Sequence, residues 1–372
     1  MGKETALTAT APQSASATPD EITGRIFSSL IDAMEIFCIY VGDQLGFYRS
    51  LHEGGPATAP ELAARAGTNE RYTREWLEQQ AVAGYLAVDN PEASADERRF
   101  HLPDSYEAVF VDPESLIGGA SMAQILVGTV APLNQLLAAF RSGDGVPYAD
   151  YGRDMHEGQA RVNRPALTQL LAQDWIAAMP DVGARLRAEP PARIADIGMG
   201  QGWSSIALAR AYPKARIDGF DLDEASVTAA RENVRESGVE DRVTMDARDA
   251  GDPDLAGQYD FALAVECVHD MADPVAVLSA MRRLVGPGGT VLIVDERVPD
   301  TFAPNGDDVE RMMYGFSVLH CLPVGMVDKP SVETGTIMRR ATFRRYAEQA
   351  GFSRVDELPV EHDTFRFYRL RG

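Results

Sequence analysis

Ala-Asp-Ile-Gly-Met-Gly-Gln-Gly at residues 195–202 is the stretch that decides the fold. An acidic residue ends a short apolar run, glycines follow at Gly198, Gly200 and Gly202, and a helix-like segment continues at 203–211. A strand, a glycine-rich turn and a helix in this order bring bare backbone close to a ligand and direct a helix N-terminus at it. The stretch therefore predicts a nucleotide site, whose ligand this turn alone does not specify.

The chain alternates strand-like and helix-like segments from residue 192 onward. We expect strands at 193–197, 216–220, 242–246, 259–265, 290–296, 353–358 and 364–370, and helices at 203–211, 223–236, 274–285 and 341–350. Such alternation predicts an α/β fold with a mostly parallel sheet covered on both faces. The last two strands are expected to form an antiparallel hairpin at the sheet edge. Residues 299–340 interrupt the alternation and are expected to form a lid or wall over the site.

The N-terminal part has the pattern of a winged helix. Residues 1–20 are rich in Ala, Thr, Ser and Pro, which predicts a disordered tail, and a helical pattern runs from residue 21 through Phe47. A capped helix at 59–66, a second at 70–83, and short strands at 84–88 and 99–102 follow. Such a unit either reads DNA or makes a subunit contact. The second helix mixes arginines with glutamates, which favours the subunit contact.

The segment 106–190 is expected to be mainly helical. A loop at 145–152 places two tyrosines between helices, and 167–179 has the pattern of an amphipathic helix. Pro190-Pro191 marks the boundary of the next domain.

Composition excludes several classes of protein. A net charge of -21 over 372 residues argues against general affinity for nucleic acid or an anionic membrane surface. The three cysteines lack metal-ligand spacing and imply no disulfide framework, so we expect no metal and a reduced, cytoplasmic setting. Neither a secretion signal nor a membrane-spanning apolar run is visible.

Three further features narrow the ligand. Asp221 ends the strand at 216–220, where an acid accepts hydrogen bonds from ribose hydroxyls; otherwise it would cap the next helix. Asp249 follows the next strand, where a carboxylate suits an exocyclic amine. Gly-Pro-Gly-Gly at 286–289 forms a helix stop and a turn into a buried strand.

Together these residues resemble the class I S-adenosylmethionine-dependent methyltransferases. The resemblance covers about residues 190–372 and implies a Rossmann-like, seven-stranded domain. It assigns Asp196 and the three glycines to the first cofactor motif, with Gly198 and Gly200 against the methionine part. It also assigns Asp221 to both ribose hydroxyls and Asp249 to the adenine side. Cofactor contacts are expected as well from three flanking residues, Leu222, Ala250 and Glu266.

A finer resemblance follows the fourth strand. Glu-Cys-Val-His-Asp-Met-Ala-Asp at 266–273 is similar to the His-Asp-Trp-x-Asp segment of small-molecule O-methyltransferases, with Met271 in place of the tryptophan. In that family the histidine is the general base, which implies this role for His269. The alternative is a histidine that caps a helix or satisfies a loop carbonyl. The same family has an N-terminal winged-helix domain that forms a dimer, which implies a homodimer here.

The resemblance also sets the expected domain boundaries and the acceptor pocket. We expect a dimerisation domain at 21–105, a helical connector at 106–190 that contributes to the pocket, and a cofactor domain at 191–372. Candidate pocket residues are aromatic, methionine and histidine side chains that suit an apolar, planar acceptor, although core packing would explain each singly: Tyr148, Tyr151, Met312, Met313, Tyr314, His320 and Met326.

The sequence therefore predicts methyl transfer from S-adenosylmethionine to a small molecule, most simply to a hydroxyl. Asp295 and Glu296 are both candidates to orient His269, and strand alternation predicts that only one of them faces it. Three alternatives stay open: N- or C-methylation, a nicotinamide oxidoreductase, and a ligand-sensing DNA-binding regulator. The third glycine comes one residue too early for the nicotinamide fingerprint.

Overall fold

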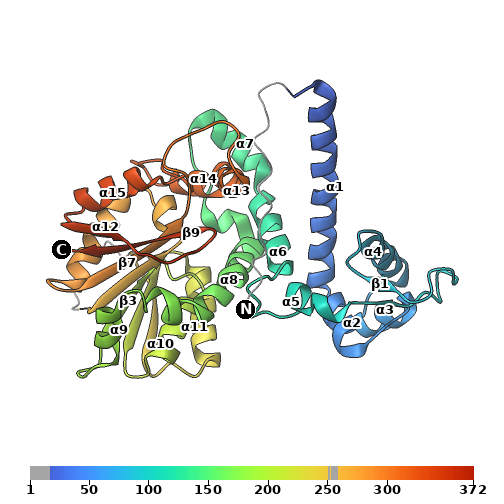
Figure 1. Cartoon of the computed structure of the whole chain (residues 1–372), viewed down its shortest axis with the longest axis horizontal. Helices are drawn as coiled ribbons and strands as arrows, with labels where there is room; N and C mark the ends of the chain where they lie inside the picture. Colours follow the sequence, from blue (N-terminus) through green and yellow to red (C-terminus); the bar gives the residue numbers. More distant parts are fainter. Residues whose placement is uncertain (1–16, 250–251, 253–258) are drawn as a thin grey trace. The chain divides into compact units, whose positions relative to one another are not determined.

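The computed structural model describes residues 17–249, 252 and 259–372. These residues form two compact units (Figure 1). The N-terminal unit contains 17–128 and 153–165, and the C-terminal unit contains 129–152 and the described residues from 166 onward. Most of the predicted tail, residues 1–16, lies outside the described residues.

The N-terminal unit is mainly helical and carries a small wing. Its elements are α1 (Pro19–Gln44), α2 (Phe47–Gly54), α3 (Ala59–Ala66), α4 (Glu70–Val82), β1 (Ala87–Val88), β2 (Phe100–His101), α5 (Glu107–Phe110) and parts of α6 (Ala120–Val130) and α8 (Gly152–Gln169). Capping residues define where the first helix of the helix-turn-helix, α3, begins and ends. Thr58 and Glu61 form a capping box before α3, and Gly67 ends that helix in the left-handed conformation. The two short strands pair antiparallel, which completes the predicted winged helix.

Two boundaries near the N-terminus differ from the prediction. Thr18 and Glu21 form a capping box, so the first helix begins at Pro19 and includes two residues that we assigned to the tail. The predicted continuous helical pattern through Phe47 is broken into α1 and α2. Gly46 adopts φ +68 at the break and caps the second helix, a conformation that glycine takes without strain.

The C-terminal unit is built on a seven-stranded sheet of order β5-β4-β3-β6-β7-β9-β8. Its strands are β3 (Arg193–Ile197), β4 (Arg216–Asp221), β5 (Val243–Ala247), β6 (Phe261–Val265), β7 (Thr290–Glu296), β8 (Arg354–Glu357) and β9 (Phe365–Arg371). Strands β3 to β7 pair parallel, and β9 pairs antiparallel with both β7 and β8. The predicted edge hairpin is confirmed.

Helices cover both faces of this sheet (Figure 1). One apolar layer includes residues of α9 (Pro180–Arg187), α10 (Trp203–Ala211) and α11 (Glu224–Glu236). The opposite layer includes residues of α12 (Pro274–Val285) and α15 (Arg340–Gln349). Every residue of β7 is buried, as expected for a strand inside a doubly covered sheet.

The segments outside this alternation have their own local structure. The amphipathic helix predicted at 167–179 is wrong: α8 ends at Gln169 and a wider π-helical turn, Leu171–Trp175, follows. The interruption at 299–340 contains α13 (Asp308–Phe316), a π-helical turn Ser317–Cys321, and α14 (Leu322–Gly325). The loop between α7 (Leu133–Ser142) and α8 contains a 3₁₀ turn, Tyr148–Tyr151.

The length and hydropathy of the described helices bear on whether one of them crosses a membrane. None of them is by itself both long and apolar enough to cross one, although α6 and α7 meet the requirement together as a bent pair.

Candidate functional site

The glycine turn between β3 and α10 leaves an open stretch of backbone. Gly200 adopts φ +52, and a Cβ built there would meet nothing within 4 Å. A Cβ on Gly198 would lie 2.7 Å from the Sγ atom of Cys267. Gly198 is therefore required by packing, whereas Gly200 keeps the backbone accessible from the open side.

Asp221 is held next to this turn by the backbone. Its Oδ2 accepts the Gly200 N–H at 2.9 Å, and its Oδ1 accepts the Asp223 N–H at 2.9 Å. Burial raises the pKa of its carboxyl, against these two hydrogen bonds. Each carboxylate oxygen has a second lone pair. The side chain can thus accept a pair of neighbouring hydroxyls without moving.

The carboxylate of Asp196 is buried and accepts hydrogen bonds from other side chains of the protein. It is 1% exposed, and its Oδ2 accepts the hydroxyls of Ser204 and Ser205 at 2.5 and 2.6 Å. Burial raises the pKa of this carboxyl to about 6. The two serines lie in the first turn of α10, so Asp196 ties the end of β3 to that helix. Sequence reasoning did not find the serines, because hydroxyls at a helix start carry no distinctive pattern.

The remaining predicted cofactor residues differ in exposure. Leu222 is 70% exposed and Asp249 is exposed at the end of β5, while Ala250 lies outside the described residues. Glu266 follows β6 and adopts φ 52, which is uncommon for a residue with a side chain. Its N–H donates to the Val294 carbonyl at 2.8 Å. Such strain tends to gather at functional sites.

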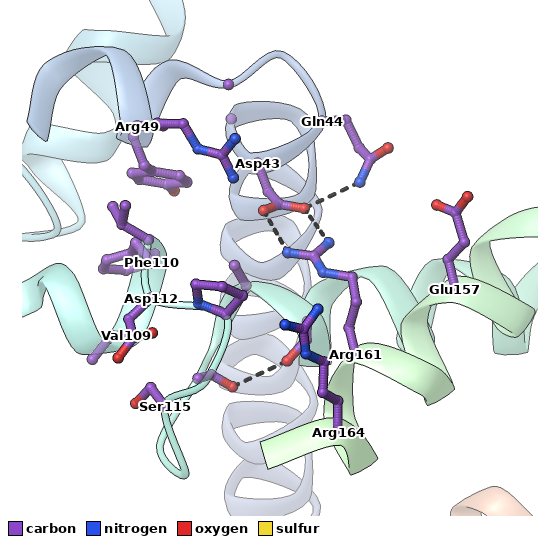
Figure 2. A pocket seen from close by; sticks show the side chains of 18 of the residues that line it. Asp43, Gln44, Arg49, Val109, Phe110, Asp112, Ser115, Glu157, Arg161 and Arg164 are labelled. Atoms are coloured by element: carbon purple, nitrogen blue, oxygen red, sulfur yellow. Dashed lines mark hydrogen bonds and ion pairs between the residues drawn. The ribbon is translucent and has the colours of Figure 1, made fainter. Parts of the chain in front are cut away.

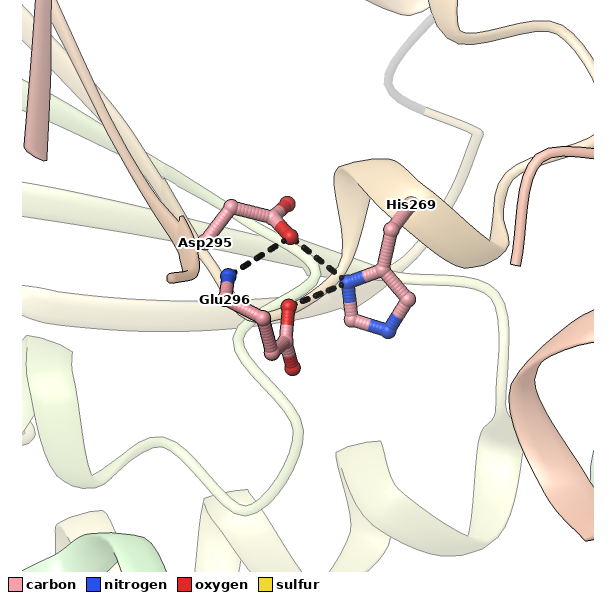
Figure 3. Close-up of side chains that lie close together, drawn as sticks. All are labelled: His269, Asp295 and Glu296. Atoms are coloured by element: carbon pink, nitrogen blue, oxygen red, sulfur yellow. Dashed lines mark hydrogen bonds and ion pairs between the residues drawn. The ribbon is translucent and has the colours of Figure 1, made fainter. Parts of the chain in front are cut away.

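His269 lies directly beyond the end of β6 and faces two carboxylates (Figure 3). Its Nδ1 hydrogen-bonds Asp295 Oδ1 at 2.9 Å, and Glu296 Oε2 lies 2.8 Å from the same nitrogen. All three side chains are at most 8% exposed. The prediction that only one acid faces the histidine is wrong, because Glu296 is the last residue of β7 and its longer side chain reaches around the strand end.

The charges of these three groups depend on one another. Burial disfavours the imidazolium, but the carboxylates of Glu296 and Asp295 outweigh it and raise the pKa of His269 well above 6.5. For Asp295 the histidine outweighs burial, and the pKa lies below its usual 3.8. Burial dominates at Glu296 and raises its pKa well above 4.5. Asp295 is therefore the more acidic of the two carboxyls, and its hydrogen bond fixes a proton on Nδ1 so that Nε2 is the basic nitrogen.

The same three side chains are close enough to one another to bind a single metal ion. Within the described part of the chain they form the one group of His, Cys, Asp or Glu whose ligand atoms suit a shared metal ion. The His269–Asp295 hydrogen bond and the Glu296–His269 ion pair already join these three groups to one another.

Three of the predicted pocket residues come together. His320 is 2% exposed, and its ring lies edge-on to Tyr151 and Tyr148 with centroids 4.6 and 5.7 Å apart. Tyr151 donates to the Leu319 carbonyl at 2.8 Å. Burial, with smaller contributions from the charges of Asp221, Asp223 and Asp270, raises the pKa of Tyr148.

The other predicted pocket residues are arranged differently. Met313 is 6% exposed and belongs to the buried side of α13, whereas Met312 is 45% exposed. Tyr314 is 36% exposed, and its hydroxyl accepts from Arg339 at 3.2 Å. Cys321, which sequence reasoning did not select, is buried, and its Sγ lies 3.4 Å from Nδ1 of His320. A lone cysteine in a helical segment gives no signal of such a contact.

Comparison with known families agrees with this geometry. Residues 194–289 match the model of a methyltransferase domain, and residues 33–111 match that of an Rv2258c-like winged HTH domain. The chain carries a methyltransferase domain. In the structure this domain is the seven-stranded sheet with its helices, and an N-terminal winged helix accompanies it.

A curated relative matches part of the methyltransferase. A ubiquinone biosynthesis O-methyltransferase of Pseudomonas aeruginosa is 34% identical over 101 residues, which are 27% of this chain and 43% of that protein. The chain thus matches less than half the length of that relative.

Solved structures match the methyltransferase over nearly its full length. Human N-acetylserotonin methyltransferase, solved with S-adenosylmethionine, has a TM-score of 0.68 at 16% identity and covers 97% of this chain and 99% of its own. An N,N-8-amino-8-demethyl-D-riboflavin dimethyltransferase from Streptomyces davawensis has a TM-score of 0.60 at 21% identity, covering 96% and 100%. These likenesses establish the fold.

Arginines on and beside α4 of the winged helix pair with carboxylates. Arg71 pairs with Glu75 on α4, and Arg74 pairs with Asp96 of the wing loop. Arg98 pairs with Glu78 in the same way. Arginines held by carboxylates are poorly placed to neutralise phosphates.

Proposed function

We propose that this methyltransferase transfers a methyl group to a hydroxyl of a small molecule, with His269 as the general base. The observation that carries the proposal is the buried His269–Asp295 hydrogen bond at the carboxyl end of the sheet. Open α/β sheets bind their ligands at this end, and the glycine turn and Asp221 lie there too.

The residues of the glycine turn fit S-adenosylmethionine. Gly200 leaves room for close approach, and Asp221 offers two fixed acceptor oxygens to the ribose hydroxyls. Tyr148, whose ring lies edge-on to His320, is a further candidate to contact the bound ligand. When bound, the cofactor supplies a methyl group on a positively charged sulfur, which is a good leaving group.

His269 would then remove the acceptor proton. With Nδ1–H committed to Asp295, the Nε2 lone pair accepts the proton of the acceptor hydroxyl. The deprotonated oxygen would then receive the methyl group that the bound cofactor supplies, which would leave a methyl ether and a neutral sulfide. Asp295 stabilises the imidazolium formed in this step.

The test compares the native enzyme with His269→Ala in labelled methyl transfer to a panel of phenols, amines and carboxylates. We expect turnover of a hydroxyl acceptor to fall by about 10²- to 10⁴-fold, the usual contribution of a general base. Calorimetry with S-adenosylhomocysteine should give nearly the same affinity for both proteins. Unchanged turnover would remove His269 as the base, and loss of cofactor binding would assign it a structural role instead.

Nitrogen acceptors are the second candidate. The structurally similar riboflavin dimethyltransferase shows that this fold also serves a nitrogen acceptor. A neutral amine is already nucleophilic, so its methylation needs proximity more than a base. Retained amine methylation by the His269→Ala variant would favour this alternative.

We also propose that the N-terminal unit forms a homodimer. Large apolar side chains are exposed along one side of α1: Ile26 at 64%, Phe27 at 62%, Leu30 at 56% and Met34 at 60%. An apolar row of this size on a helix normally marks a surface that another protein covers. The mixed charge of α4 supports this use of the winged helix over DNA binding.

A further inference from the structure

The N-terminal unit contains a cavity of 420 Å³ that methyl transfer does not require (Figure 2). It lies among α1, α2, α5, the loop before α6, and the first part of α8. Apolar groups, including Tyr48, Phe110, Pro113 and Pro165, form part of its wall. The volume falls in the range of small-molecule sites.

The charged part of the wall is dominated by arginine. Arg49 comes from α2, and Arg153, Arg161 and Arg164 come from α8. They face three acidic side chains in the lining, Asp43, Asp112 and Glu157. A cavity with more guanidinium than carboxylate groups is unusual in a chain of net charge -21.

Three of the four arginines already have carboxylate partners. Arg161 binds Asp43 through both terminal nitrogens at 2.7 and 2.8 Å, and Arg153 binds Glu157 at 2.7 Å. Arg164 pairs with Glu114. The two-pronged bond between Arg161 and Asp43 largely neutralises both of these charges.

Arg49 has no such partner. Among the described residues, no hydrogen bond or ion pair reaches its guanidinium, although its side chain points into the cavity (Figure 2). It offers a planar group with several donors that matches a carboxylate or a phosphate. Ala120 and Ser121 at the start of α6 also line the cavity, and the N-terminus of this helix adds positive potential.

We propose that this cavity binds a small organic anion, with Arg49 holding an oxyanion group and the Tyr48–Phe110 wall holding an apolar body. Tyr48 and Phe110 stack with ring centroids 4.5 Å apart, so each ring holds the other in place. Flat apolar groups pack well against such a surface. An inorganic anion would use the arginine and leave the apolar wall without a ligand.

Calorimetry on the full chain tests the site with benzoate, its uncharged counterpart benzamide, and inorganic phosphate. We expect saturable benzoate binding, with benzamide and phosphate at least about tenfold weaker, since a charge-assisted hydrogen bond and apolar burial each contribute that much. Arg49→Gln should weaken benzoate binding by about tenfold or more, and Arg49→Lys by less. Arg49 is exposed, so the melting temperature should not change.

Arg71→Gln is the matched control, because Arg71 is exposed on α4 and pairs only locally with Glu75. This variant should bind benzoate like the native protein. Benzoate binding that is absent, equal to that of benzamide, or unchanged in Arg49→Gln would overturn the proposal. Phosphate binding as strong as that of benzoate would refute the organic part of it. None of these outcomes depends on methyl transfer.

Discussion

Replacing Asp295 by Asn tests the chemistry of the site most directly. The substitution keeps the shape of the side chain and removes the charge that lies 2.9 Å from His269 Nδ1. Asparagine can also donate from its amide, which would favour the wrong tautomer and leave the proton on Nε2. The variant therefore separates the charge of Asp295 from its volume.

The size of the effect follows from the lost hydrogen bond. A hydrogen bond to a charged group is worth about 1.5–3 kcal/mol, and each ~1.4 kcal/mol is a factor of ten in rate. Since Asp295 stabilises the imidazolium formed during proton removal, kcat should fall by about 10- to 150-fold. Binding of S-adenosylhomocysteine should remain nearly unchanged.

The pH dependence provides a second, independent result. As the proposed base, His269 must be neutral to act, and its pKa lies well above 6.5 because Glu296 and Asp295 outweigh burial. The native enzyme should therefore gain activity as pH rises through a value above 6.5. Removing the charge of Asp295 removes part of that shift, so the limb should move to lower pH in Asp295→Asn.

Asp260→Asn is the control for this experiment. Asp260 precedes β6 at the opposite end of the strand and binds Arg185 at 2.7 and 3.0 Å. Its loss should lower stability without moving the pH limb. A limb that stays in place in Asp295→Asn, or moves equally in both variants, would refute the assigned role of the Asp295 charge.

Two further variants test the cofactor turn and the dimer. Gly200→Val should abolish most binding of S-adenosylhomocysteine in calorimetry. A φ of +52 costs a branched residue at least about 1–2 kcal/mol, and the new side chain fills the open side of the turn. Native affinity in this variant would show that the cofactor does not use this side. Leu30→Glu should shift the protein from dimer to monomer in sedimentation analysis, because it places a charge in the exposed apolar row of α1. The control Ser29→Ala, on the same helix, adds no charge and should leave the native mass unchanged.

Most of the C-terminal fold could be predicted from the sequence. The strands β3 and β7 and the helices α10 and α12 have the predicted bounds, because short apolar runs with glycine, proline or aspartate at their ends leave few alternatives. The π-helical turn at Leu171–Trp175 could not be predicted, since it keeps a helix-like apolar pattern while widening one turn.

The site was predictable in its acids and glycines but less so in its contacts. The order of the sequence predicted that His269 follows β6. Strand alternation predicted wrongly that only one acid faces His269, because alternation does not take into account how far the long side chain of Glu296 reaches at the strand end. Tyr314 was expected in the pocket, but its hydroxyl bonds Arg339. Contacts between distant segments, such as the hydrogen bond from Tyr151 to Leu319, depend on packing that no local pattern encodes.

The place of β9 in the sheet has a consequence for how the chain is made. Asp295 and Glu296 lie opposite Arg366 and Phe365, so the strand that carries the two acids gains its second neighbour only when the last strand of the sheet has been synthesised. Until then β7, which is buried along its whole length, is an apolar edge open to other chains. The strand that carries the two acids is thus enclosed late in synthesis. A nascent chain that stalls before residue 365 is prone to aggregate.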